Sequence, residues 1–211
     1  MSPDLATELA RVRIVPVVTV GRVEQAVPLA RALVAAGLPI VEITLRTEAA
    51  LDAIAAIAET VRDALVGAGT VLAPGQAEAA VAAGARFLVS PGATPALREA
   101  IPATGAPWLP GAATPSEAMR LREAGWTMLK WFPAEQAGGA AMLKALAAVI
   151  PDLRFCPTGG IGPDKARAYL DLPNVVAVGG SWMVPGDAID AQDWWRIETL
   201  AHDAAALAAS G

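Results

Sequence analysis

The lysine at position 130 is the side chain best suited to covalent chemistry. The chain has only three lysines, and this one stands in the segment TMLKWFP among apolar neighbours. If the segment is a strand, Met128, Lys130 and Phe132 share one face and Leu129 and Trp131 the other. Burial disfavours the charged form of an amine, and a neutral amine can attack a carbonyl to form a Schiff base. The alternative is a strand lysine whose ammonium reaches solvent at the rim.

A glutamate interrupts a second apolar run, PIVEITLRT. Alternation places Ile40, Glu42 and Thr44 on one face, which we expect to point inward because the other face is entirely apolar. A buried carboxylate is costly unless it is paired or hydrogen-bonded. Glu42 is therefore expected to form an ion pair with Lys130 or Arg46, to act as a general acid/base, or to do both.

Other positions favour anion binding. Arg46 could bind a substrate carboxylate through two hydrogen bonds, or it could lie on the surface. Two later segments end in the turns Thr158-Gly159-Gly160 and Gly179-Gly180-Ser181. Glycines let backbone N–H groups approach an anion, and a helix N-terminus after the first turn adds a favourable dipole. Both turns predict a phosphate site, although glycine also marks ordinary strand ends.

These residues must be positioned by a repeating pattern of short β-rich runs and Ala-rich helical segments, with a period of roughly 20–25 residues. The expected strands are 13–20, 39–45, 64–70, 86–90, 107–110, 127–132, 153–158 and 175–179. Parallel strands need crossover helices, so we predict an α/β fold. The specific prediction is a closed (β/α)₈ TIM barrel with a short N-terminal helix, capped by Ser2 or Asp4, and one domain over residues 1–211.

An open doubly wound sheet is the structural alternative. It would have fewer strands in a chain of this length, and no G-x-G-x-x-G follows the first expected strand. In a barrel the active site lies at the C-terminal ends of the strands. Residues 187–210 are expected to form one or two final helices.

Composition excludes several classes of protein. Of 211 residues, 55% are hydrophobic and 18% charged, which is too apolar for a disordered chain. No charge-free stretch is long enough for a membrane span. The net charge of −5 and the lack of basic runs argue against nucleic acid as a partner. The N-terminus lacks a signal-peptide pattern, so a cytoplasmic location is expected. One cysteine, Cys156, and one histidine, His202, exclude a disulfide framework and a site with several His ligands.

Taken together, the motifs resemble one family, the KDPG aldolases (2-dehydro-3-deoxy-phosphogluconate aldolases). The matching segments run across nearly the whole chain in family order: PVV (16–18), EITLRTE (42–48), VGAGTVL (66–72), SPG (90–92), PG (110–111), TPSE (114–117), KWFPAE (130–135), FCPTGGI (155–161) and GGSWMVP (179–185). The resemblance implies a class I aldolase on a (β/α)₈ barrel, usually a homotrimer.

The same resemblance implies roles for individual residues. Lys130 matches the Schiff-base lysine and Glu42 the general acid/base. The implied substrate-binding positions are Arg46, Thr70 and Pro91 around the pyruvate carboxylate, Phe132 along the substrate, and Thr158, Gly159, Gly160, Gly179, Gly180 and Ser181 around pyruvate and phosphate. Two residues depart from the family pattern. Trp131 is expected to face away from the site, and Gly162 is expected to loosen the phosphate turn.

The implied reaction cleaves 2-dehydro-3-deoxy-6-phospho-D-gluconate to pyruvate and D-glyceraldehyde 3-phosphate. Cleavage of 4-hydroxy-2-oxoglutarate to pyruvate and glyoxylate is implied as a second activity. The expected partners are therefore a phosphorylated keto acid and pyruvate. No metal or other cofactor is expected, because the iminium serves as the electron sink. Three alternatives remain open: the 6-phosphogalactonate aldolase, epimeric at C4, a phosphosugar isomerase, and a non-catalytic phosphosugar-binding barrel.

Overall fold

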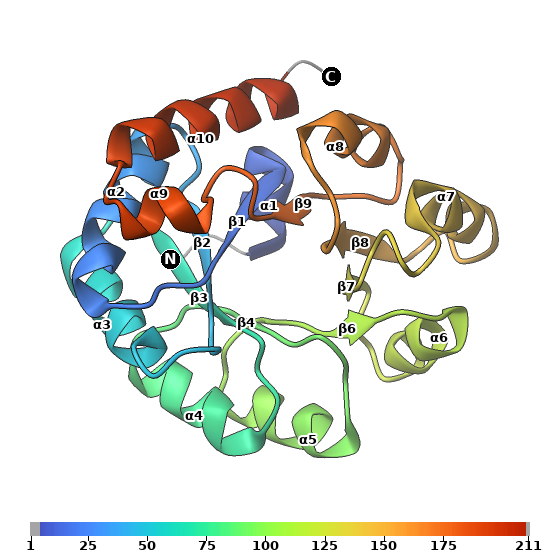
Figure 1. Cartoon of the computed structure of the whole chain (residues 1–211). Coiled ribbons are helices and arrows are strands. Elements are labelled where there is room, and N and C mark those ends of the chain that lie inside the picture. Colours follow the sequence, from blue (N-terminus) through green and yellow to red (C-terminus); the bar gives the residue numbers. More distant parts are fainter. Residues whose placement is uncertain (1–4, 210–211) are drawn as a thin grey trace.

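The computed structural model describes residues 5–209, in which parallel strands alternate with helices that lie around them (Figure 1). The strands are β1 (Ile14–Val18), β2 (Ile40–Thr44), β3 (Leu65–Gly69), β4 (Leu88–Val89), β5 (Trp108–Leu109), β6 (Gly111–Ala112), β7 (Met128–Trp131), β8 (Arg154–Pro157) and β9 (Val178–Gly180). Each of the eight expected strands has a counterpart. The last lies nearer the C-terminus than expected, and β6 is an additional short strand that follows β5 after Pro110.

The strands form two parallel sheets. One has the order β5-β4-β3-β2-β1-β9, and the other has the order β6-β7-β8. Isolated parallel bridges join Phe155 to Val175 and Thr158 to Gly179, next to β8 and β9. The predicted α/β fold with parallel strands is confirmed. Closure of the strands into one eight-stranded ring stays a prediction.

Helix α1 precedes β1, and the other helices follow strands in the sequence. Their bounds are α1 (Leu5–Val12), the 3₁₀ helix η1 (Val23–Gln25), α2 (Ala26–Ala35), α3 (Ala50–Thr60), α4 (Pro74–Ala82), α5 (Pro95–Ala103), α6 (Pro115–Glu123), α7 (Gly139–Val149), α8 (Pro163–Leu170), α9 (Gly186–Asp190) and α10 (Trp194–Ala209). Four of them begin with proline, whose fixed φ suits the first helical position. The N-terminal helix is confirmed, while its expected caps Ser2 and Asp4 lie outside the described residues. The C-terminal segment forms two helices, as expected.

Side chains alternate along the strands, so that apolar residues occupy one face and inward-pointing polar residues the other. Leu129 and Trp131 of β7 are fully buried, and the Trp131 ring packs edge-on against Phe155 of β8 with 5.7 Å between ring centroids. The indole N–H of Trp131 donates to the carbonyl of Ala137. Burying an apolar side chain of this kind contributes about 1.5–3 kcal/mol. Lys130, between these two residues, is thereby held on the opposite face of the strand. Within residues 5–209, every helix is too short or too polar to cross a bilayer.

Candidate active site

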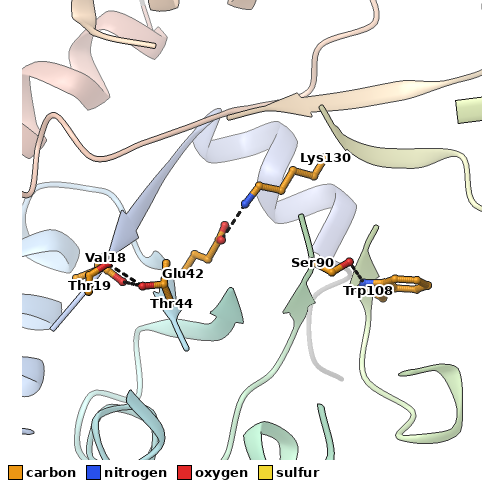
Figure 2. Close-up of polar contacts among 7 residues, drawn as sticks. All are labelled: Val18, Thr19, Glu42, Thr44, Ser90, Trp108 and Lys130. Carbon is orange, nitrogen blue, oxygen red and sulfur yellow. Dashed lines mark hydrogen bonds and ion pairs between the residues drawn. The ribbon is translucent and has the colours of Figure 1, made fainter. Parts of the chain in front are cut away.

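Lys130 of β7 and Glu42 of β2 meet inside the fold. The Nζ atom of Lys130 donates to Oε1 of Glu42 over 3.1 Å, and Figure 2 shows the two side chains pointing toward each other. Lys130 is 5% exposed and Glu42 is 3% exposed. The expectation that both residues face inward is confirmed. Of the two partners predicted for Glu42, the structure selects Lys130.

A glycine leaves room for this pair. Gly69 of β3 lies beside Glu42, and a Cβ atom at Gly69 would lie 2.1 Å from Oε1 of Glu42. Gly111 of β6 pairs in register with Lys130. A Cβ atom at Gly111 would lie 2.2 Å from the carbonyl oxygen of Pro91. The space for the carboxylate therefore depends on a missing side chain on the neighbouring strand.

Two residues of the same region define the surroundings of the amine. Nζ of Lys130 lies 5.3 Å from the centroid of the Phe132 ring. Cys156 of β8 is in register with Lys130 and buried. Burial raises the pKa of the Cys156 thiol to about 12, and the Glu42 carboxylate adds to the effect. The thiol is therefore neutral near pH 7 and is a core residue rather than a competing nucleophile.

A pocket of about 360 Å³ brings most of the expected substrate-binding residues together. Its lining consists of Val17, Thr19, Arg46, Phe132, Thr158, Gly159, Gly160, Ile161, Gly180, Ser181, Val184, Pro185, Gly186 and Ile189. Seven of the ten expected binding residues are among them. A pocket of this size suits a small organic substrate. Since Phe132 both lines the pocket and contacts Lys130, the pocket adjoins the Lys130–Glu42 pair.

The glycine-rich turn after β8 has a left-handed backbone. Gly159 and Gly160 have φ values of 107° and 76°, a region that residues with a side chain rarely adopt. Gly162, one of the two departures from the family pattern, precedes α8 and provides no side-chain cap. The other departure, Trp131, faces away from Lys130 as expected. The turn therefore lies directly before the N-terminus of α8.

Three expected binding residues do not line this pocket. Thr70 follows β3 in a left-handed conformation with φ of 60°. Pro91 packs its carbonyl against Gly111, and Gly179 leaves space for Thr158, whose Oγ1 would lie 2.3 Å from a Cβ at that position. Thr70, Pro91 and Gly179 remain predictions as substrate contacts.

Sequence reasoning missed several residues that the structure places at or near the pocket. Thr19 lines the pocket after β1, and its Oγ1 lies 2.7 Å from Oγ1 of Thr44. The expected strand 13–20 contains Thr19, and only the end of β1 at Val18 in the structure places Thr19 just beyond the strand. Ser90 belongs to the SPG segment (90–92) that the sequence already singled out, and it does not line this pocket. It is fully buried and accepts a hydrogen bond from the indole N–H of Trp108 over 3.0 Å (Figure 2). Val184, Pro185, Gly186 and Ile189 around the start of α9 were also missed, and no local signal identifies them.

A further missed residue, Glu135, ties the loop after β7 to α8. Its carboxylate accepts from Nζ of Lys165 over 2.6 Å and from the hydroxyl of Tyr169. The Lys165 ammonium and the Tyr169 hydroxyl hold the pKa of Glu135 below its ordinary value. The carbon chain of Glu135 also occupies the space beside Gly160, where a Cβ would lie 2.9 Å from Cγ. Glu135 therefore packs against the glycine-rich turn at Gly160 and links it to α8.

Within residues 5–209, no three His, Cys, Asp or Glu side chains lie close enough together to hold a metal ion.

Comparison with known proteins identifies the family. The sequence pattern of the family described as "Aldolase: KDPG and KHG aldolase" matches residues 5–200. The 2-dehydro-3-deoxy-phosphogluconate aldolase of Pseudoalteromonas atlantica is 50% identical over 196 residues, covering 93% of this chain and 91% of that protein. The KHG/KDPG aldolase of Escherichia coli is 50% identical over 191 residues, covering 90% of each.

A solved structure extends the likeness to three dimensions. The KDPG aldolase of Legionella pneumophila, with pyruvate captured as a covalent carbinolamine intermediate, superposes with a TM-score of 0.92 at 44% identity. The match covers 96% of this chain and 98% of that one. The likeness therefore covers both the sequence and the fold. The chain belongs to the KDPG and KHG aldolase family.

Proposed function

We propose that this chain is a class I aldolase that cleaves 2-dehydro-3-deoxy-6-phospho-D-gluconate to pyruvate and D-glyceraldehyde 3-phosphate. The observation that carries the proposal is the buried pair of Lys130 and Glu42, 3.1 Å apart beside a substrate-sized pocket. The relative from Pseudoalteromonas atlantica, named for this reaction, supports the choice of substrate. The relative from Escherichia coli, named as a KHG/KDPG aldolase, supports cleavage of 4-hydroxy-2-oxoglutarate as a second activity.

The first half of the reaction forms the Schiff base. Glu42 lies close enough to Lys130 to take a proton from its ammonium, which frees the nitrogen lone pair. The amine attacks C2 of the keto acid to give a carbinolamine, and loss of water gives the iminium. The carbinolamine captured in the Legionella pneumophila enzyme supports this order of events. Burial of the pair keeps competing bulk water away from the iminium.

The second half breaks the C3–C4 bond. Glu42, acting through a bridging water, takes the proton of the C4 hydroxyl. The hydroxyl becomes the aldehyde of glyceraldehyde 3-phosphate, and the electron pair of the C3–C4 bond moves into the iminium to give an enamine. Protonation of the enamine at C3 and hydrolysis of the resulting iminium release pyruvate and restore Lys130. Because the iminium accepts the electron pair, the proposal needs no metal ion.

The anionic ends of the substrate are assigned to separate parts of the pocket. Arg46, at its edge, is exposed and suited to a carboxylate. The left-handed turn at Gly159 and Gly160, together with Gly180 and Ser181, offers backbone amides and a hydroxyl to the phosphate. Contacts from Thr70, Pro91 and Gly179 remain part of the proposal.

We also infer that the two sheets belong to one closed (β/α)₈ barrel in a single domain. The bridges next to β8 and β9, and the succession of β5 and β6 on either side of Pro110, support this inference. A homotrimer and a cytoplasmic location are proposed from the family resemblance. Light scattering coupled to size-exclusion chromatography tests the trimer.

Covalent trapping tests the proposed function directly. Incubation with pyruvate and borohydride should add one reduced pyruvate to Lys130, located by peptide mass spectrometry. Lys130→Met should abolish the adduct, while Lys144→Met, which removes an exposed lysine of α7, should leave it intact. A wild-type enzyme that turns over without any adduct would overturn the proposal.

The choice of substrate needs a second measurement. Cleavage rates for the two C4 epimers, measured side by side, should favour the gluconate. Faster cleavage of the galactonate epimer would reassign the enzyme to the other aldolase. An isomerase or a non-catalytic binding protein would give neither the pyruvate adduct nor pyruvate release.

A further inference from the structure

The hydroxyl of Thr19 is held at the pocket by two consecutive hydrogen bonds. Thr19 lines the pocket together with Arg46. Oγ1 of Thr19 lies 2.7 Å from Oγ1 of Thr44, and Thr44 Oγ1 donates to the carbonyl of Val18 over 3.1 Å (Figure 2). Thr44 is 1% exposed, whereas Thr19 is exposed. The inner hydroxyl is therefore fixed in the interior, and the outer one is available to a ligand.

The direction of these two bonds follows from counting hydrogens. A threonine hydroxyl has one hydrogen and two lone pairs. The carbonyl of Val18 can only accept, so Thr44 uses its single hydrogen there. The bond between the two hydroxyls must then take its hydrogen from Thr19. With that hydrogen directed at Thr44, the oxygen of Thr19 presents only lone pairs to the pocket.

An oxygen that can only accept selects the chemistry of its ligand. A carboxylate or an ionised phosphate has no hydrogen to donate, so neither end of the proposed substrate suits Thr19. A substrate hydroxyl has a hydrogen to donate and therefore suits Thr19. In the proposed reaction the C4 hydroxyl gives its proton toward Glu42, which leaves the C5 hydroxyl.

We propose that Thr19 is a specificity-determining residue that accepts a hydrogen bond from the C5 hydroxyl of the six-carbon substrate. The inference rests on the proposed function. This hydrogen bond would distinguish the six-carbon substrate from 4-hydroxy-2-oxoglutarate, which carries a carboxylate at C5 and no hydroxyl there. Thr19 thus raises kcat/KM for the longer substrate through a hydrogen bond to a hydroxyl that the shorter one lacks.

A double-mutant cycle tests the contact. The wild type and Thr19→Val are each assayed with the six-carbon substrate and with its 5-deoxy analogue. Removing either partner should lower kcat/KM about tenfold, because one neutral hydrogen bond is lost. Removing both partners should lower kcat/KM no further than removing one of them. If the two changes together lower kcat/KM by the product of their separate effects, or if Thr19→Val lowers it not at all, the proposal is overturned.

Companion variants identify the cause of the effect. Thr19→Ser keeps the hydroxyl and should restore the coupling to the C5 hydroxyl. Thr44→Val removes the oxygen that orients Thr19 and should weaken the coupling. Thr199→Val, a matched change on α10 where Thr199 donates only to the carbonyl of Trp195, should change neither substrate's rate. If the wild type fails to cleave the six-carbon substrate at all, the proposed function itself falls, and this inference falls with it.

Discussion

The Nζ atom of Lys130 lies 3.1 Å from Oε1 of Glu42, although 88 positions of sequence separate the two residues. The two strands that carry them belong to different sheets, and both side chains are almost completely buried. A buried ion pair is a poor source of stability, because desolvation offsets much of the attraction. Its presence beside the pocket is better explained by chemistry that needs an amine and a nearby proton acceptor.

Glu42→Gln should separate adduct formation from turnover. The amide still fits the interior but cannot take a proton, so kcat should fall about 10²-fold or more. Some pyruvate should still be trapped on Lys130 by borohydride, since the nucleophile remains. Steady-state kinetics and mass spectrometry measure the two effects. Undiminished kcat would remove Glu42 from its proposed role.

Gly69→Ala should displace the Glu42 carboxylate without replacing a catalytic residue. The new Cβ would lie 2.1 Å from Oε1 of Glu42, so the buried carboxylate must move away from its present position. We expect kcat to fall about tenfold or more, since positioning errors near 1 Å can cost that much. Gly75→Ala on α4, where the added carbon meets nothing within 4 Å, is the control. Equal kcat for the two variants would contradict the prediction.

Cys156 should resist thiol reagents in the folded protein. Its pKa of about 12 results first from burial and then from the Glu42 carboxylate, so the reactive thiolate is scarce at neutral pH. A chromogenic disulfide reagent should leave the native protein unmodified and react with one thiol per chain after denaturation in guanidinium chloride. Rapid labelling of the native enzyme would show that this interior face is open to solvent.

Glu135→Gln should remove a pH-dependent part of the stability. The folded-state pKa of Glu135 is lowered from 4.5, first by the hydrogen bond from Lys165 and then by that from Tyr169. A lowered pKa stabilises the fold above the unfolded-state value and ceases to do so as pH falls through the folded-state value.

Urea unfolding measures that effect. The wild type should exceed Glu135→Gln in free energy of unfolding by up to about 1 kcal/mol at neutral pH, a modest figure because the pair is partly exposed to solvent. The difference should shrink below about pH 4.5. A difference that stays constant through this range would assign the loss to packing instead.

Aldol cleavage should survive chelation. In the proposed reaction the iminium accepts the electron pair, so EDTA should leave kcat unchanged within experimental error. The assay is pyruvate release before and after treatment. Loss of activity that a divalent metal restores would point to metal-dependent aldolase chemistry.

Local sequence pattern was enough to predict most of the elements and the interior pair. Alternation in MLKWF and IVEIT is a property of neighbouring residues, and the structure confirms the inward faces of Lys130 and Glu42. The glycine-rich turn at Gly159 and Gly160 was identified from its residues as a candidate anion site, and its left-handed backbone angles are ones that few residues other than glycine tolerate. The predicted strand ranges were less accurate where strands are short: β9 lies nearer the C-terminus than expected, and β6 was not predicted.

Tertiary structure alone decided which of these groups meet. The sequence left two charged partners open for Glu42, Lys130 and Arg46. Only the arrangement of the two sheets, which brings β7 opposite β2, selected Lys130. The contact of Thr19 with Thr44, and that of Glu135 with Tyr169, join segments far apart in the chain. The strands, their faces and the chemical groups they carry could be predicted from sequence, since these depend on near neighbours. Hydrogen-bond partners and pocket walls depend on how whole elements pack, which no local pattern contains.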